Sequence, residues 1–416
     1  MPTSSRKQRP NSAQPKVSVA IQESVNKNKF LLLEAALRAS EFWTTIEEAR
    51  KAANIPSDEF RVLIKPDMEF FDVGAPTGTD PQLVEHLIDL LASAGYSNVC
   101  VADGLGGSSA WLENRDVIVL ADLVGYRFKT DRGHSYEILN LSEDLADGGF
   151  PPESTLHGTA LSKAWTEANF RISMAKNKTD EENRYALGLQ NLLGVLPLVE
   201  KDFHYHSRLQ SPEVCVDLLR RTPVHFAIID GFVSNHGGAG SRTTCPLKTR
   251  TIIASSELLL ADWAGALKMG LDPYGSRLNS HAFRTIGLPA EYRIIGDVIP
   301  YQGWNNVPLL VSDSVRKRNE TPLIRRMAKP WLQVVNGELF PFKSPVDGQI
   351  NAFLTRALAD IDNHPLSYWA TIALNYFLGS LHDVVEGWRV LYDKDKLHRK
   401  KVSLNIDLSA FSIEDY

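Results

Sequence analysis

The sequence predicts an α/β protein with a mainly parallel sheet flanked by helices, followed by a mostly helical C-terminal extension. Two observations carry this prediction. Short apolar runs end in turn or charged residues, as buried parallel strands do, and such runs stop at Lys65, Asp103, Lys176 and Asp230. Segments with apolar residues at helical spacing lie between them. Strands and helices therefore alternate along the chain, as in a sheet built by crossover connections.

The predicted elements follow the chain in order. Residues 62–102 form the clearest unit: a strand, a helix that Pro81 opens after a Thr79 or Asp80 cap, and a second strand. Such a unit is right-handed and builds a parallel sheet. The other predicted elements are strands at 16–20, 170–175, 225–229 and 252–254 and helices at 30–53, 212–220 and 257–269.

The chain of 416 residues is longer than one core usually allows, so either two units or one large unit with an extension is expected. Residues 1–15 are predicted to be a disordered basic tail, and residues 16–300 an α/β domain. Residues 301–416 form the extension, in which Asn336-Gly337 favours a hairpin and 349–391 favours helices. Apolar stripes on those helices suggest assembly, for example as a homo-oligomer.

Composition excludes some functions and leaves others open. The net charge of −5 provides no basic footprint, so nucleic acid is not an expected partner. The three cysteines, Cys100, Cys215 and Cys245, are far apart, which is typical of reduced thiols in a cytoplasmic protein. There is no Cys-x-x-Cys pair, so an iron–sulfur cluster is not expected. Neither a secretory signal nor a membrane span is predicted.

Several motifs, taken in order, resemble the domain-of-unknown-function 362 family over roughly residues 16–290. They are Leu63-Ile64-Lys65-Pro66-Asp67, Thr79-Asp80-Pro81, Val101-Ala102-Asp103, Lys176-Asn177-Lys178, Asn191-Leu192-Leu193-Gly194, Ile228-Ile229-Asp230-Gly231, and Ala254-Ser255 with Ala261-Asp262. The resemblance implies a parallel core sheet and a site at its edge, but no established activity. The chain departs from the family pattern at three positions, where Asp67 replaces an Asn, Asp180 a His and Gln190 a Lys.

The predicted site lies at the carboxyl ends of the strands, because ligands of open α/β sheets bind there. Lysine ammonium groups at this edge suit a small molecule with a carboxylate or phosphate, and the asparagine amide suits its orientation. A solvated loop or strand end explains each lysine equally well. The predicted substrate-binding residues are Lys65, Asp67, Lys178, Asn191 and His236, and the predicted catalytic residues are Asp230, Asp103 and Lys176.

Asp230 and Asp103 are the acids of this site, and each precedes a glycine. Their carboxylates suit a divalent metal, a sugar hydroxyl or the role of general base. Alternatively, each Asp-Gly is simply a turn in which the carboxylate bonds the local backbone. Gly104, Gly106 and Gly107 after Asp103 are able to form an anion-binding backbone nest. Binding of a divalent metal therefore stays an open alternative, and the sequence does not identify the metal.

Three functions remain after this step. The first is an enzyme for a small anionic substrate, with lysines holding the anion and aspartates binding a metal or moving a proton. The second is a protein that binds a metabolite or cofactor without transforming it and assembles through its C-terminal helices. The third, carbon-centred chemistry as in nickel-pincer racemases, rests on analogy of fold, and Asp180 in place of the family's His argues against it. His204 and His206 are a further candidate metal pair.

Overall fold

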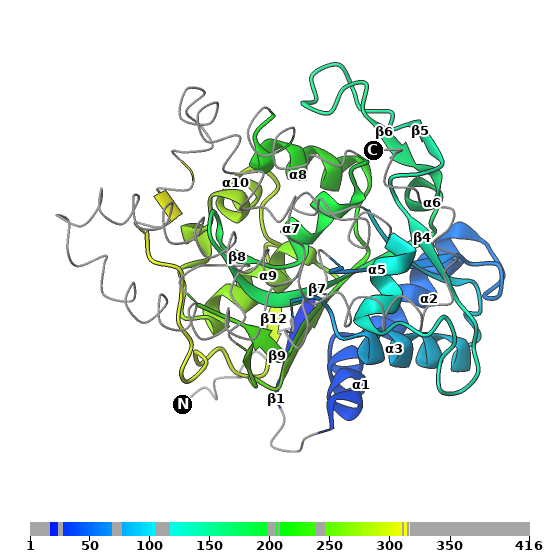
Figure 1. Ribbon diagram of the computed structural model, residues 1–416, viewed down its shortest axis with the longest axis horizontal. Helices are drawn as coiled ribbons and strands as arrows, with labels where there is room; N and C mark the ends of the chain where they lie inside the picture. Colours follow the sequence, from blue (N-terminus) through cyan, green and yellow to red (C-terminus); the bar gives the residue numbers. More distant parts are fainter. Residues whose placement is uncertain are drawn as a thin grey trace, which may run out of the picture.

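The computed structural model describes residues 17–23, 28–68, 77–104, 117–197, 205, 209–237, 246–309, 312–313 and 316. Most strands of this part form one mixed sheet (Figure 1). Its strands are β1 (Ser18–Glu23), β2 (Val62–Pro66), β3 (Val99–Asp103), β4 (Glu137–Asn140), β7 (Phe170–Asp180), β8 (Arg184–Ala186), β9 (Phe226–Asn235), β10 (Pro246–Leu247), β11 (Thr251–Ser255) and β12 (Arg293–Ile295). A separate antiparallel hairpin contains β5 (Leu145–Asp147) and β6 (Ala160–Ser162).

The strand order across the sheet is β12-β1-β11-β9-β7-β2-β3-β4, with β8 paired to β7 and β10 to β9. Neighbours from β9 to β4 are parallel, and β11 is antiparallel to both β9 and β1. The prediction of a mainly parallel sheet is confirmed. The chain builds outward from β2 to β3 and β4, and then returns to place β7 on the other side of β2. This reversal between β2 and β7 is a topological switch point, where ligands of such sheets bind.

Helices cover both faces of the sheet, each over its own apolar core (Figure 1). One face packs against α1 (Lys29–Ala39), α2 (Phe42–Ala53), α3 (Pro81–Ser93) and α5 (Val117–Val124). The other packs against α6 (Lys163–Thr166), α7 (Gly188–Asn191), η1 (Leu192–Val195), α8 (Ser211–Arg221), α9 (Leu258–Lys268) and α10 (Arg277–Thr285), with the short helix η4 (Pro273–Gly275) beside them. On β2, Val62 and Ile64 join the first core and Leu63 the second, because strand side chains alternate.

Some elements differ from the sequence prediction at their ends. The helix predicted at 30–53 is two helices, because Glu41 between them adopts the left-handed conformation with φ 59°. The strand predicted at 170–175 continues as β7 to Asp180, and β9 continues past Asp230 to Asn235. At Gly231 a Cβ atom would lie 2.9 Å from the Thr251 carbonyl oxygen, so only glycine lets β9 stay paired with β11 there.

The N-terminal tail, the hairpin at 336–337 and the helices at 349–391 lie outside the described residues, and the boundary near 300 stays a prediction. Among the residues that are described, no helix is long and apolar enough to cross a membrane.

Candidate functional site

Three buried lysine–aspartate pairs occupy the carboxyl ends of four adjacent parallel strands. The N–O distances are 2.7 Å for Lys65–Asp103, 2.8 Å for Lys176–Asp230 and 2.9 Å for Lys178–Asp67. All six side chains are at most 10% exposed. Six of the eight predicted site residues therefore meet in three ion pairs.

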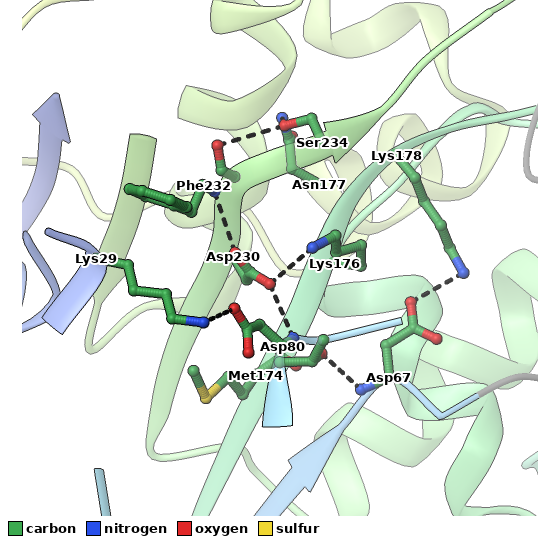
Figure 2. A network of polar contacts seen from close by, with 12 residues as sticks. Lys29, Asp67, Asp80, Met174, Lys176, Asn177, Lys178, Asp230, Phe232 and Ser234 are labelled. Carbon is green, nitrogen blue, oxygen red and sulfur yellow. Dashed lines mark hydrogen bonds and ion pairs between the residues drawn. The ribbon is translucent and has the colours of Figure 1, made fainter. Parts of the chain in front are cut away.

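Each pair joins neighbouring strands of the sheet. Lys65–Asp103 connects β2 to β3, and Lys176–Asp230 connects β7 to β9, where the two residues are register partners. Lys178–Asp67 connects β7 to the residue after β2, so it spans the switch point. Figure 2 shows Lys176 directed toward Asp230 and Lys178 directed toward Asp67. The charged groups thus line one edge of the sheet.

The Lys65–Asp103 pair is enclosed by backbone and by Asn191. The Lys65 ammonium also donates to Asn191 Oδ1 at 2.8 Å and to the Pro66 carbonyl at 2.9 Å. Asp103 accepts from the backbone N–H groups of Met68 and Gly104 at 2.9 and 2.8 Å. Little hydrogen-bonding capacity remains for a ligand at this pair.

The short helix η1 passes directly over the same pair. A Cβ atom on Gly194 would lie 2.4 Å from Asp103 Oδ1 and 2.5 Å from Lys65 Nζ. Glycine is therefore required for this close approach, and the backbone of η1 covers the pair.

Asn191, the predicted amide of the site, orients Lys65. Its Nδ2 donates to the Lys65 carbonyl at 3.1 Å and to Ser173 Oγ at 3.0 Å, and its Oδ1 accepts from the Lys65 ammonium. Asn191 follows Gly188 and Leu189, whose N–H groups donate to the fully buried Asp262 at 2.8 and 3.0 Å. Burial raises the pKa of Asp262 to about 6. The start of α7 is therefore fixed by an acid from α9.

Asp230 lies at the N-terminus of α3. One of its carboxylate oxygens accepts from Lys176 Nζ at 2.8 Å and from the Asp80 N–H at 3.0 Å, and the other accepts from the Phe232 N–H at 3.1 Å. Asp80 also caps α3 by accepting from the Gln82 N–H, and its side chain pairs with Lys29 (Figure 2). Because helix N-termini favour anions, the Asp230 carboxylate occupies a position suited to negative charge.

Lys178–Asp67 is the most exposed of the three pairs, at 5% and 10%, against 2% and 0% for Lys176–Asp230. The backbone around it is fixed, because the Asp67 N–H donates to Thr79 Oγ1, which in turn donates to the Met174 carbonyl at 2.6 Å. The strand ends are thus rigid, while the two charged side chains lie nearest to solvent.

His236 directly follows β9 and contacts Trp304 and Asn305. Its Nδ1 accepts from the Asn305 N–H at 3.0 Å, and its ring lies 5.4 Å from the Trp304 ring. Burial lowers the pKa of His236. At neutral pH the ring is therefore uncharged and carries its proton on Nε2.

Asp103 and Asp230 do not approach each other. They lie on β3 and β9 with β2 and β7 between, and three strand spacings amount to about 14 Å. A metal bound at either acid would need other ligands. Among the described residues, no three His, Cys, Asp or Glu side chains gather as a metal site requires. His204, His206, Cys245, Gly106 and Gly107 lie outside the described part of the chain.

Sequence reasoning missed several residues that hold the site. Thr79 was considered only as a helix cap, although it ties the exit of β2 to β7. Asp80 was predicted as a cap but not as a contact of Asp230. Gly194 was noted in a motif without its close approach to the Lys65 pair. The only sequence signal for these roles was membership of the quoted motifs.

Two of the three positions that depart from the family pattern contact each other. Gln190 Nε2 donates to Asp180 Oδ2 at 2.9 Å, and the Asn183 N–H donates to Asp180 Oδ1 at 2.6 Å. Burial, with the nearby Glu181, raises the pKa of Asp180 to about 7. The third position, Asp67, pairs with Lys178. Each acid that departs from the pattern therefore has a specific partner.

Comparison with known proteins agrees with the strand-end motifs. Residues 62–267 match the family "Domain of unknown function (DUF362)". The predicted resemblance to this family is confirmed over these residues. The match includes β2, β3, β7 and β9, and therefore all three lysine–aspartate pairs of the DUF362 site.

No curated protein matches the chain. Among solved structures, the chain is similar to the lactate racemase apoprotein from Thermoanaerobacterium thermosaccharolyticum, with 10% identity and a TM-score of 0.34. The match covers 58% of this chain and 54% of the other, so the chain spans about half the length of that protein. A likeness this weak supports no conclusion about activity.

Proposed function

We propose that this DUF362 protein is an enzyme that acts on a small anionic substrate at the switch point between β2 and β7. The supporting observation is the set of three buried lysine–aspartate pairs at this edge. Buried ion pairs often stabilise a fold no better than apolar residues of the same volume. Three of them together, at the edge where ligands bind in such sheets, therefore favour a binding role over a purely structural one.

Lys178 is the proposed anchor for the substrate anion. Its pair with Asp67 is the most exposed of the three and spans the switch point. A carboxylate or phosphate of the substrate would take over the Lys178 ammonium from Asp67. Lys65 has a supporting role, because Asn191, Asp103 and the backbone of η1 enclose it.

Lys176 and Asp230 are the proposed proton-transfer pair. Lys176 precedes Lys178 by two residues, so the two side chains start about 7 Å apart on β7. A small substrate anchored at Lys178 can therefore reach the Lys176 ammonium. Asp230, held by two backbone N–H groups, would keep Lys176 oriented and accept a proton from its ammonium group. Asp103 would position Lys65.

Ligand screening tests the binding step. The full chain is purified, co-purifying small molecules are identified by native mass spectrometry, and a panel of carboxylates and phosphates is screened by thermal shift. Lys178→Met should abolish binding of any carboxylate or phosphate ligand found that lacks an ammonium group. Lys163→Met is the matched control, because Lys163 pairs with Asp144 at 2.8 Å but both side chains are exposed. Equal ligand binding by the two variants would overturn the proposal that Lys178 anchors the substrate.

Turnover separates the enzyme from the non-catalytic alternative. Asp230→Asn should retain binding of a ligand anchored at Lys178 but abolish its conversion. Binding that Lys178 controls, with no conversion of any bound compound by the wild-type protein, would instead favour a binding protein. The helices that the alternative uses for assembly lie outside the described residues.

A further inference from the structure

A cavity of about 320 Å³ is lined by the start of α8, η4, α10 and the residues Leu309, Ser312, Asp313 and Arg316. This volume is at the lower end of the range for small-molecule sites. None of the residues of the three lysine–aspartate pairs lines it. It is therefore separate from the proposed active site.

One wall of the cavity is basic. Arg277, His281 and Arg284 lie on successive turns of α10, and all three line the cavity. Arg277 donates to Gln210 Oε1 at 2.8 Å. Arg284 and His281 have no hydrogen bond or ion pair among the contacts of the described residues. The guanidinium of Arg284 is thus available to an anionic group.

The α8 side of the cavity carries the acid Glu213, and Glu182 and Asp313 also line the cavity. Glu213 lies in the first turn of α8, and its Oε2 atom is buried without a hydrogen-bond partner in the described part of the chain. Buried carboxylate oxygens nearly always accept a hydrogen bond, because leaving one without a donor is costly. A ligand ammonium in the cavity would supply the missing donor once the Glu213 side chain rotates toward the cavity, because Oε2 is buried in the present rotamer.

The remaining wall is partly apolar. Pro212, Leu309 and the ring of Tyr274 contribute to it, and the Tyr274 ring packs edge-on against Phe283 at 5.5 Å. An apolar side chain of a ligand could pack against these groups. The cavity therefore offers an acid, a base and an apolar surface within one small volume.

We infer that this cavity binds a small zwitterion of the α-amino acid class. The ligand ammonium pairs with Glu213, the ligand carboxylate pairs with Arg284, and its side chain packs on Tyr274. The inference rests on the cavity alone and does not depend on the proposed active site.

Titration calorimetry of the wild-type chain against free amino acids is the test. At least one amino acid should bind, and its N-acetyl and carboxamide derivatives should each bind at least about tenfold more weakly, which is 1.4 kcal/mol. Absence of binding by every free amino acid at millimolar concentration, or equal binding of the blocked derivatives, would overturn the inference. This measurement uses only the wild-type chain, so its outcome does not depend on whether a variant folds.

Two substitutions assign the contacts. Glu213→Gln should abolish the preference for the free amino acid over its N-acetyl derivative. Arg284→Gln should abolish the preference for the free amino acid over its carboxamide derivative. Arg220→Gln is the matched control, because Arg220 lies on α8 but bonds the Thr285 carbonyl instead of lining the cavity. Wild-type preferences in both variants would contradict the assignment. Lys178→Met should retain amino-acid binding, which separates this site from the proposed active site.

Discussion

The two ends of β7 both bury positive charge, but they neutralise it in different ways. At the amino end Arg171 donates to the backbone carbonyls of Pro223, Trp165 and Ala168 at 2.8–3.2 Å. At the carboxyl end Lys176 and Lys178 pair with carboxylate side chains. A backbone carbonyl cannot leave its partner without unfolding, whereas a carboxylate side chain can rotate away. The amino end therefore serves the fold, and the carboxyl end is the one suited to exchange a partner for a ligand.

The environment of Arg171 supports this distinction. Its guanidinium lies over the Trp165 ring at 5.9 Å, and burial lowers its pKa to about 10. Its backbone N–H donates to His225 Nδ1 at 2.9 Å, and the His225 ring stacks on Phe170. Each of these contacts fixes the chain, and none of them is with an acid.

Loss of the Asp230 carboxylate should have the largest effect. Asp230→Ala leaves the Lys176 ammonium buried without its counter-ion, so we expect a loss of about 3–5 kcal/mol in the free energy of unfolding. Adding Lys176→Met to this variant should recover part of the loss, because the uncompensated charge is removed. Urea denaturation measures both. A loss below about 1 kcal/mol would show that this pair is not buried as described.

Arg171→Met should also destabilise the fold, by about 2–3 kcal/mol, because three carbonyl groups lose their donor and two of these hydrogen bonds are buried. Ligand binding at the carboxyl end should not change. Measurements of unfolding free energy and of ligand affinity on the same variant test this. Weakened affinity in a folded variant would contradict the proposal that the amino end of β7 serves only the fold.

Lys178→Met should cost less stability than either, about 1–2 kcal/mol, because the Asp67 carboxylate that remains is the most exposed of the three acids and can be hydrated. Lys163→Met, at the exposed pair, should leave thermal stability unchanged. If the Lys178 and Lys163 variants melt at the same temperature, the buried ion pair contributes no more to stability than the exposed one.

The two ends should respond to pH in opposite senses. Asp180, with a pKa raised to about 7, keeps its proton in the fold over a range where the unfolded chain has lost it, so stability should fall as pH rises from about 4 to 7. Burial lowers the pKa of His225 to about 4, so the fold excludes a proton that the unfolded chain binds. Stability from this group should fall as pH drops from about 6.5 to 4.

Asp180→Asn and His225→Asn should each remove one of these slopes from a profile of unfolding free energy against pH. The Asp180 variant gains stability relative to wild type toward neutral pH, and the His225 variant gains it toward acid. Identical profiles for wild type and both variants would show that neither group titrates differently on folding.

The alternation of strands and helices was predictable, and so was the meeting of distant charges at one edge. The apolar runs before Lys65, Asp103 and Asp230 marked three parallel strands, and the Thr79-Asp80-Pro81 motif marked the start of α3, with Asp80 as its cap. These signals are local. Parallel strands bring their carboxyl ends together whatever the intervening loops contain, so the position of the charged residues at one edge of the sheet could be predicted from the strands alone.

The pairing of the charges was not predictable. The sequence suggested a strand near 170–175 and left open whether it persists through Lys176 and Lys178. In the structure β7 continues to Asp180, since Asp230 and Asp67 neutralise its lysines and β8 pairs with its end. Both partners come from other strands, and no spacing in the chain indicates which acid meets which lysine.

The left-handed turn at Glu41 was missed for a similar reason. No glycine or proline marks the break between α1 and α2, and the apolar periodicity continues through it. Packing of both helices on the sheet imposes the left-handed conformation of Glu41, which the local sequence does not predict.

Gly194 ties three positions of the chain together. Since only a hydrogen atom fits between η1 and the ion pair beneath it, any larger residue at 194 must displace either the turn or the charges. Positions 65, 103 and 194 are therefore expected to vary as a unit in related chains: a lysine and an aspartate accompanied by glycine, or all three replaced.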